Sequence, residues 1–244
     1  MNTLIIGIDC AVQPENVGLA CGTMNGSVVT LTPAQPCTRT TCVAGQIADW
    51  IAPAERVLLA LDAPLGWPRP LARALPSHAA GQAMHPSANE LFRRETDRHV
   101  RNTYKKQSLD VGADRIARTA YAALELLDKL RTKTREAIPL AWEHDFTERV
   151  AAIEVYPAAT LVAHGWEHKG YRPALAVLKR KLLIDCAFDT ANLGDAAASM
   201  VKSTHVCDAG LCVLAGADFL LGEAVGPQDK ELANKEGWIW VLRR

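Results

Sequence analysis

The N-terminal part of the chain contains the run Leu4-Ile5-Ile6-Gly7-Ile8-Asp9-Cys10, which is almost entirely apolar until the carboxylate of Asp9. Such a run without polar alternation is typical of a strand buried on both faces of a sheet. Residues 17–24 form a second expected strand, and Asn25-Gly26 is a strong hairpin signal because both residues accept positive φ. With residues 27–32 as the third strand, the chain is expected to open with three consecutive antiparallel strands.

Beyond this opening, the hydrophobic pattern changes to that of a helix and then back to that of a strand. Residues 42–52 carry apolar side chains on one helical face. Residues 56–62 form another apolar run, which ends in a second carboxylate, Asp62. A buried strand that is reached through a helix is expected to lie parallel to an earlier strand. Residues 151–156 are expected to form one more buried strand.

Farther along the chain, helices are expected at residues 108–130, 172–184 and 205–222. The tail at residues 236–241 is expected to be either a closing strand or a packed terminal segment. This order predicts an α/β fold of the ribonuclease H-like class, with three antiparallel strands followed by parallel strands, and with flanking helices. We expect a single domain over residues 1–244 with a basic helical insertion at about residues 66–150.

The charge of the chain is balanced overall but uneven along the sequence. The chain has 244 residues, with 27 Lys and Arg against 27 Asp and Glu, so its formal net charge is zero. This balance argues against a dedicated, high-affinity nucleic-acid coat protein, although it allows a local basic patch. Residues 93–135 carry twelve basic and six acidic side chains and form such a basic island.

Composition also indicates the compartment. No apolar run approaches the roughly 20 residues that span a bilayer, and the N-terminus lacks the features of a signal peptide, so no membrane association is expected. The seven cysteines include no CxxC pair, which argues against a zinc ribbon. They fit small buried side chains in a reducing environment, and we expect a cytoplasmic protein.

Four acidic residues lie in apolar surroundings: Asp9, Asp62, Glu154 and Asp208. A carboxylate in such a setting is costly unless it is paired, hydrogen-bonded or bound to a cation. Since Mg²⁺ or Mn²⁺ prefers hard oxygen ligands, a shared two-metal site is one interpretation. Each acid could instead end a strand or cap a helix at the surface, and Glu154 could meet an arginine.

Two further features suggest substrate contacts. Trp67 lies in a stiff segment between Pro64 and Pro68, where it could face a base or sugar or could simply anchor the loop. Arg94, Arg98 and Arg101 would share one face of a helix and could bind phosphates. The alternative for these arginines is a solvated face paired with neighbouring acids.

The residues above include motifs of a known family. The chain resembles the domain of unknown function 429 family, whose members are regarded as predicted ribonuclease H-like nucleases. The matching motifs are Gly7-Ile8-Asp9, Leu61-Asp62-Ala63-Pro64-Leu65-Gly66-Trp67-Pro68, Arg94-Glu95-Thr96-Asp97-Arg98, Glu154-Val155-Tyr156-Pro157-Ala158, His205-Val206-Cys207-Asp208-Ala209 and Glu236-Gly237-Trp238-Ile239.

The resemblance implies a ribonuclease H-like core with a metal site at Asp9, Asp62, Glu154 and Asp208. In related resolvases the last helix carries two metal-site positions one turn apart, and here these positions are His205 and Asp208.

Three functions remain in competition at this point. The first is a metal-dependent nuclease or phosphodiesterase, a hydrolase that uses Mg²⁺ or Mn²⁺ on nucleic acid or nucleotide phosphodiesters. The second is an ATP-dependent phosphotransferase like actin or sugar kinases, against which the absence of a glycine-rich phosphate loop argues. The third is a non-enzymatic binding module in which acids and arginines form internal ion pairs. A monomer and a homo-oligomer both stay open.

Overall fold

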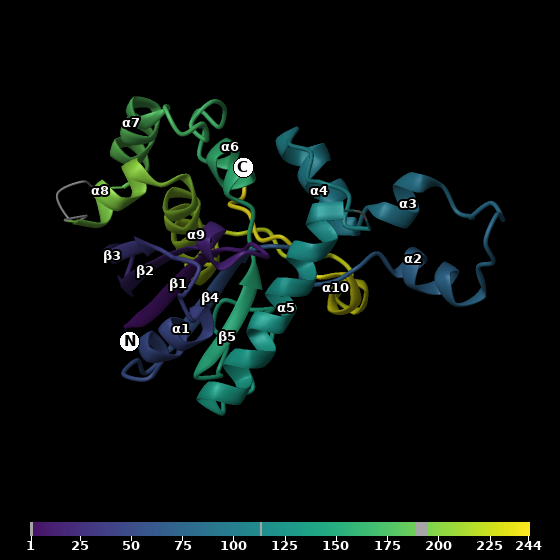
Figure 1. The fold of residues 1–244 in the computed structure, drawn as a ribbon, viewed down its shortest axis with the longest axis horizontal. Helices are drawn as coiled ribbons and strands as arrows, with labels where there is room; N and C mark the ends of the chain where they lie inside the picture. Colours follow the sequence, from purple (N-terminus) through teal and green to yellow (C-terminus); the bar gives the residue numbers. More distant parts are fainter. Residues whose placement is uncertain (1, 113, 189–194) are drawn as a thin grey trace.

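A mixed sheet lies at the centre of the computed structural model, with the strand order β3-β2-β1-β4-β5 (Figure 1). The structure describes residues 2–112, 114–188 and 195–244. The strands are β1 (Thr3–Asp9), β2 (Gly18–Asn25), β3 (Val28–Pro36), β4 (Val57–Asp62) and β5 (Val150–Glu154). β2 is antiparallel to β1 and β3, whereas β1, β4 and β5 are mutually parallel. The predicted α/β class with a mixed sheet is confirmed.

The predicted hairpin is present between β2 and β3. Asn25 pairs with Val28, and Gly26 has a φ of +61°, which a glycine adopts at little cost. β3 continues to Pro36, beyond the expected end at Thr32, through backbone pairing with the start of β2. The apolar alternation that marks a strand in the sequence stops before this backbone pairing does.

The helices fall on the two faces of the sheet and beyond its edge. They are α1 (Val43–Ile51), α2 (Arg69–Ala74), α3 (Ala88–Phe92), α4 (Glu95–Tyr104), α5 (Asp114–Thr134), α6 (Pro157–Ala163), α7 (Val177–Ala187), α8 (Asp195–Lys202), α9 (Thr204–Leu220) and α10 (Lys230–Glu236), with short 3₁₀ turns at Pro14–Asn16 and Leu75–Ser77. The expected helices correspond to α1, α5, α7 and α9, and α5 begins later and ends later than predicted.

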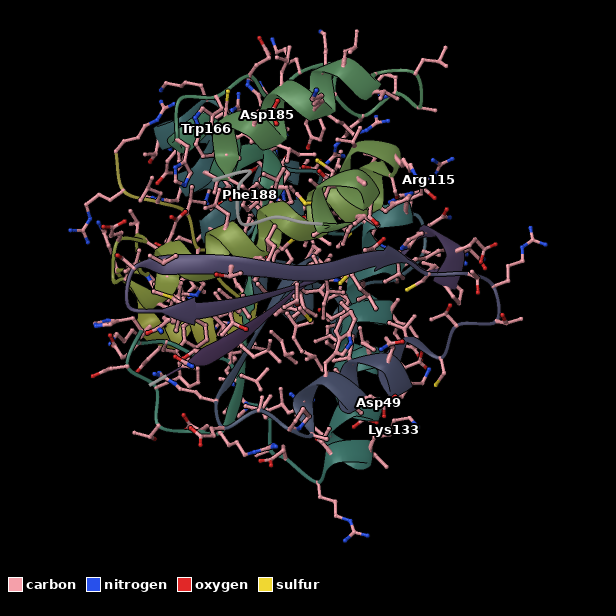
Figure 2. The ribbon with its side chains drawn as sticks, turned by 90° about the vertical axis from the view of Figure 1, so that its left-hand side faces the viewer. Asp49, Arg115, Lys133, Trp166, Asp185 and Phe188 are labelled. Atoms are coloured by element: carbon pink, nitrogen blue, oxygen red, sulfur yellow. The ribbon has the colours of Figure 1, made fainter. Side chains whose placement is uncertain are left out.

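The core consists of two apolar layers, one on each face of the sheet. Alternate residues of a strand point to opposite faces, so Ile5 packs with α9 in one layer and Ile6 packs with α1 and α5 in the other. Figure 2 shows this sandwich: Asp49 and Lys133 lie on one side of the sheet, and Asp185 and Phe188 lie on the other. The carboxyl ends of β1, β4 and β5 therefore open between two helical layers.

α9 crosses the sheet at unusually short range because two glycines face it. A Cβ atom at Gly7 would lie 2.0 Å from the carbonyl oxygen of Ala209, and one at Gly18 would lie 1.9 Å from that of His205. Both distances are impossible for a real side chain. Glycine at these two positions thus brings the start of α9 against the end of β1.

The segment of residues 66–150 contains α2, α3, α4 and α5. α2 and α3 extend away from the sheet, whereas α5 lies along it (Figure 1). Ala123, Leu127 and Leu130 of α5 belong to the apolar layer beneath the sheet. Within the described residues, every helix is too short or too polar to cross a membrane.

The C-terminal tail forms a packed segment that touches the sheet at one point. Ile239 makes a single parallel bridge to Glu154 at the end of β5, and the Trp240 amide donates to the Glu154 carbonyl at 3.0 Å. Trp238 and Trp240 are buried. Of the two expected forms of the tail, the packed terminal segment is the one observed.

Candidate functional site

Two of the predicted acids are direct neighbours at the carboxyl edge of the sheet. Asp9 is the last residue of β1 and Asp62 is the last residue of β4, and the parallel register pairs them with each other. On the other side of Asp9, its antiparallel partner is Gly18, which has no side chain to cover it. The carboxylates of these two residues therefore lie at the same edge of the sheet.

α9 brings a third acid and a histidine to the same place. His205 and Asp208 lie one turn apart in the first part of α9, which Gly7 and Gly18 allow to approach. His205 Nδ1 lies 2.7 Å from Asp9 Oδ2. Because an ionised carboxylate can only accept a hydrogen bond, the proton of this bond belongs to His205.

The fourth acid, Glu154, is paired with an arginine. Its two carboxylate oxygens accept from Arg94 Nη1 and Nη2 at 2.8 and 2.7 Å, and the Leu65 amide donates to it at 3.0 Å. Asp97 binds the same guanidinium through Oδ1 and Oδ2. The arginine alternative considered for Glu154 is thus the arrangement that the structure contains.

The three predicted phosphate-binding arginines do not share one surface. Arg94 is only 1% exposed and precedes α4, with its guanidinium turned inward to Glu154 and Asp97. Arg98 and Arg101 are exposed on α4, and Arg98 donates to the carbonyl of Arg93 at 2.7 Å. The sequence spacing placed all three on a helix, but Arg94 is the cap residue before its first turn.

Two residues that the sequence interpretation missed complete the surroundings of Asp208. The Tyr171 hydroxyl donates to Asp208 Oδ1 at 2.6 Å, and Arg172 Nη2 lies 3.1 Å from Asp208 Oδ2. Gly170 and Pro173 bracket this pair and mark a turn in the sequence, with Gly170 at a φ of +74°. A turn signal carries no indication of the helix that it will contact, so the role of Arg172 had no local signature.

A cavity of about 370 Å³ opens beside these acids. Its lining includes Asp9, Asp62, Glu154, Tyr156 and Arg172. A second cavity of about 560 Å³ is lined by His205 and Asp208, and also by Asp9 and Arg172. Asp9 and Arg172 thus border both cavities.

Trp67 lies apart from these spaces. Its side chain is half-buried, and it is not among the described residues that line either cavity. Gly66 before it packs tightly on the backbone of Glu236, where a Cβ would come within 2.6 Å of the carbonyl carbon. This contact resembles the anchoring role that was the alternative for the loop.

The carboxylates at the sheet edge have unusual electrostatics. Burial raises the pKa of Asp62 well above its usual value, and the charges of Asp9 and Asp208 raise it further. Burial also raises the pKa of Asp9, against the opposing effect of His205, and raises the pKa of Asp208 to about 6, against that of Arg172. The hydrogen bond to Asp9 raises the pKa of His205.

Asp62 differs from Asp9 and Asp208 in its contacts. Within the described part of the chain, its carboxylate makes no hydrogen bond or ion pair. An unpaired, partly buried carboxylate beside two others is costly, and a cation is the natural relief. The donor set of Asp9, Asp62 and Asp208 consists of hard carboxylate oxygens, which fit Mg²⁺ or Mn²⁺.

Within the described residues, the acidic side chains do not form a metal coordination sphere. Over residues 2–112, 114–188 and 195–244, no three His, Cys, Asp or Glu side chains already surround one common point as metal ligands. Asp9 is turned to His205 and Asp208 to Arg172. A metal cation would have to compete with His205 for Asp9 and with Arg172 for Asp208.

Comparison with known proteins places most of the chain in one family. The family described as "Protein of unknown function (DUF429)" has a model that matches residues 7–232. Neither the curated proteins nor the solved structures contain a match.

Proposed function

Since the chain belongs to the DUF429 family, whose function is unknown, we propose a function from the site: a metal-dependent phosphodiesterase with a ribonuclease H-like fold. Its substrates would be nucleic acid or nucleotide phosphodiesters. The strand order supports the fold assignment, because three antiparallel strands followed by two parallel ones is the arrangement of that class.

The observation that carries the proposal is the carboxylate of Asp62, which lies beside Asp9 and makes no hydrogen bond or ion pair with any described residue. These three residues would hold the Mg²⁺ or Mn²⁺. When bound, the cation would polarise a phosphoryl oxygen and lower the pKa of an attacking water. The adjoining cavity provides space for a phosphodiester beside the acids.

The other residues of the site have positioning roles in this proposal. His205 donates to Asp9 and orients its carboxylate, although the family resemblance makes it a metal ligand itself. Glu154 holds Arg94 and the Leu65 amide at the edge of the cavity, so we assign it to the frame of the site rather than to the metal.

The test is Mn²⁺ binding and phosphodiester cleavage by the parent and by Asp62→Asn. The amide keeps the shape of the side chain and removes its charge, so the variant is expected to fold, to lose Mn²⁺ binding in isothermal titration calorimetry and to lose cleavage of a model phosphodiester. Asp218→Asn is the matched control, because Asp218 is a buried acid of α9 that contacts His164 instead. Equal Mn²⁺ affinity in parent and Asp62→Asn would refute the assignment.

A non-enzymatic binding module is the second candidate. The buried pair of Arg94 with Glu154 and the half-exposed pair of Arg172 with Asp208 favour it, because they neutralise two of the four predicted acids without a metal. This function predicts no Mn²⁺ binding at millimolar concentration and no loss of stability in Asp9→Ala. The same calorimetric titration therefore decides between the two candidates.

A further inference from the structure

Two loops that contribute to the lining of the cavity beside the acids carry basic side chains. Lys106 follows α4, directly before Gln107 of the cavity lining, and Lys169 and Arg172 lie in the loop between α6 and α7. We call Lys106, Lys169 and Arg172 the basic rim. The two loops border the same cavity, because Gln107 and Arg172 both line it, and the hydroxyl of Tyr156, another lining residue, donates to the Gln107 carbonyl at 3.3 Å.

The charges of the basic rim act on one another. Burial lowers the pKa of Lys106, and the charges of Arg172 and Lys169 lower it further. His168 is similarly affected, since burial and the charges of Lys106 and Lys169 lower its pKa. The charge of Glu167 acts in the other direction and raises the pKa of His168.

The cations of the basic rim are available to a ligand. In the described part of the chain, neither Lys106 nor Lys169 forms an ion pair with an acid. Arg172 pairs with Asp208, yet its side chain is 54% exposed. The ammonium of Lys179 adds a further positive charge next to the loop of Lys169 and Arg172, because it lies 2.8 Å from where a Cβ of Gly170 would be.

Positive charges that converge repel one another unless an anion lies between them, and within the described residues only Arg172 of the three is paired with an acid. Next to them, the cavity offers the half-buried ring of Tyr156 and the exposed apolar side chain of Leu109. A positively charged path with aromatic or apolar surfaces for bases is the pattern of single-stranded nucleic-acid binding. A cavity of about 370 Å³ is too small for a duplex but large enough for about one nucleotide.

We propose that the basic rim binds the phosphate backbone of a single-stranded nucleic acid, so that one base enters the cavity and the adjoining phosphodiester faces Asp9 and Asp62. The inference rests on the proposed function for its purpose, but strand binding itself needs no metal. In this proposal the basic rim binds phosphate, instead of Arg94, Arg98 and Arg101.

The test is binding of a short fluorescein-labelled oligodeoxythymidine in EDTA, followed by fluorescence anisotropy at several salt concentrations. Lys106→Ala/Lys169→Ala is expected to lower the affinity about tenfold or more at low salt. It should also reduce the slope of log K against log[salt] by about 1.4, because about 0.7 is lost for each phosphate contact on a single strand. Lys106→Arg/Lys169→Arg should bind like the parent, and a duplex of the same length should bind more weakly.

The matched control is Lys129→Ala/Lys133→Ala, which removes the same charge from α5; Lys133 lies beneath the sheet (Figure 2). This control is expected to bind like the parent. The inference is overturned if the oligonucleotide does not bind, if both double variants lose the same affinity, or if only Arg98→Ala/Arg101→Ala loses it. If the oligonucleotide binds through the basic rim but the protein binds no Mn²⁺, the proposed function is refuted and the inference about the basic rim is supported.

Discussion

Arg172 provides a positive charge where the proposed function requires a metal ion. Its guanidinium lies 3.1 Å from Asp208 and lowers the pKa of Asp62, Asp9 and Asp208. A fixed cation stabilises carboxylates in the absence of metal, but it repels a second cation nearby. Arg172 therefore stabilises the charged carboxylates when no metal is bound, and it disfavours the binding of a metal cation.

Arg172→Gln is expected to bind Mn²⁺ more tightly than the parent, by about three- to tenfold, because the competing charge is gone. Isothermal titration calorimetry at constant pH measures this change. Lys106→Gln, which removes a charge of the same rim without contact to Asp208, should change the Mn²⁺ affinity less. Weaker Mn²⁺ binding in Arg172→Gln would show that Arg172 supports the ligands rather than opposing the ion.

The raised pKa values of Asp9, Asp62 and Asp208 make the site sensitive to pH. A carboxyl whose pKa is higher in the folded state binds more protons there than in the unfolded chain. In the window between its usual value and its folded value, about 6 for Asp208, the free energy of unfolding therefore falls as the pH rises. Bound metal reverses this effect because it takes the place of the protons.

We therefore expect the Tm increase caused by Mn²⁺ to be larger at pH 7 than at pH 5, with affinity falling about tenfold for each pH unit below 6 if one proton is displaced. Differential scanning fluorimetry with and without Mn²⁺ measures the shift. The shift should vanish in Asp62→Asn at both pH values. A Tm increase that is equal at pH 5 and pH 7 would contradict the pKa argument.

At the scale of elements, the close crossing of α9 over β1 determines whether the site exists. Gly7 and Gly18 allow this crossing, and both face backbone carbonyls that have no freedom to move aside. Asp208 and His205 reach Asp9 only because α9 lies at this distance. The register of the sheet and the small residues that face α9 therefore build the site together.

Gly7→Ala is expected to destabilise the fold by about 1–3 kcal/mol through overpacking, and to weaken Mn²⁺ binding by moving Asp208 away from Asp9. Urea unfolding and calorimetric titration measure the two effects. Gly45→Ala inside α1 is the control: its Cβ would meet only the Cys42 side chain, and helix propensity favours alanine there. Unchanged stability and metal affinity in Gly7→Ala would contradict the role of the crossing.

The elements differ in how far the sequence predicts them. β1, β4 and β5 are continuous apolar runs, and the adjacency of Asp9 and Asp62 follows from two parallel strands that end in acids. Short helices such as α6 and α10 lack enough turns to show a period, and α4 is polar around most of its surface. Their positions depend on tertiary contacts, which local patterns do not contain.

The site was predictable to the same extent. Strand ends located Asp9 and Asp62, and helical spacing placed Asp208 near His205. The partners of these acids were not predictable, because the direction of Arg94 depends on where α4 begins, and the position of Arg172 depends on the path of the loop after α6. Ion pairs between distant loops are a property of the assembled fold.

At the scale of the whole molecule, one buried arginine joins three distant parts of the chain. Arg94 precedes α4, pairs with Glu154 at the end of β5, and donates to the Glu236 carbonyl at 3.0 Å. Gly237 has a φ of +80°, and a Cβ there would lie 2.8 Å from Glu154 Oε2. The helical segment, the sheet and the C-terminal tail therefore meet at a single charge cluster.

Arg94→Met is expected to cost about 3–5 kcal/mol, because Glu154 and Asp97 would stay buried without their counter-charge. Urea denaturation measures the free energy of unfolding. Arg101→Met on the exposed face of α4 is the control and should change stability by less than about 0.5 kcal/mol. Equal free energies of unfolding for the two variants would mean that the cluster around Arg94 does not stabilise the fold.

This cluster has a consequence for the role of the tail. The carbonyl of Glu236 accepts from Arg94, and the amide of Trp240 donates to the carbonyl of Glu154 at the end of β5. Detaching this segment would leave a buried guanidinium and the last backbone carbonyl of β5 each short of one hydrogen bond. The C-terminal tail therefore supports the carboxyl edge of the sheet without being one of its strands.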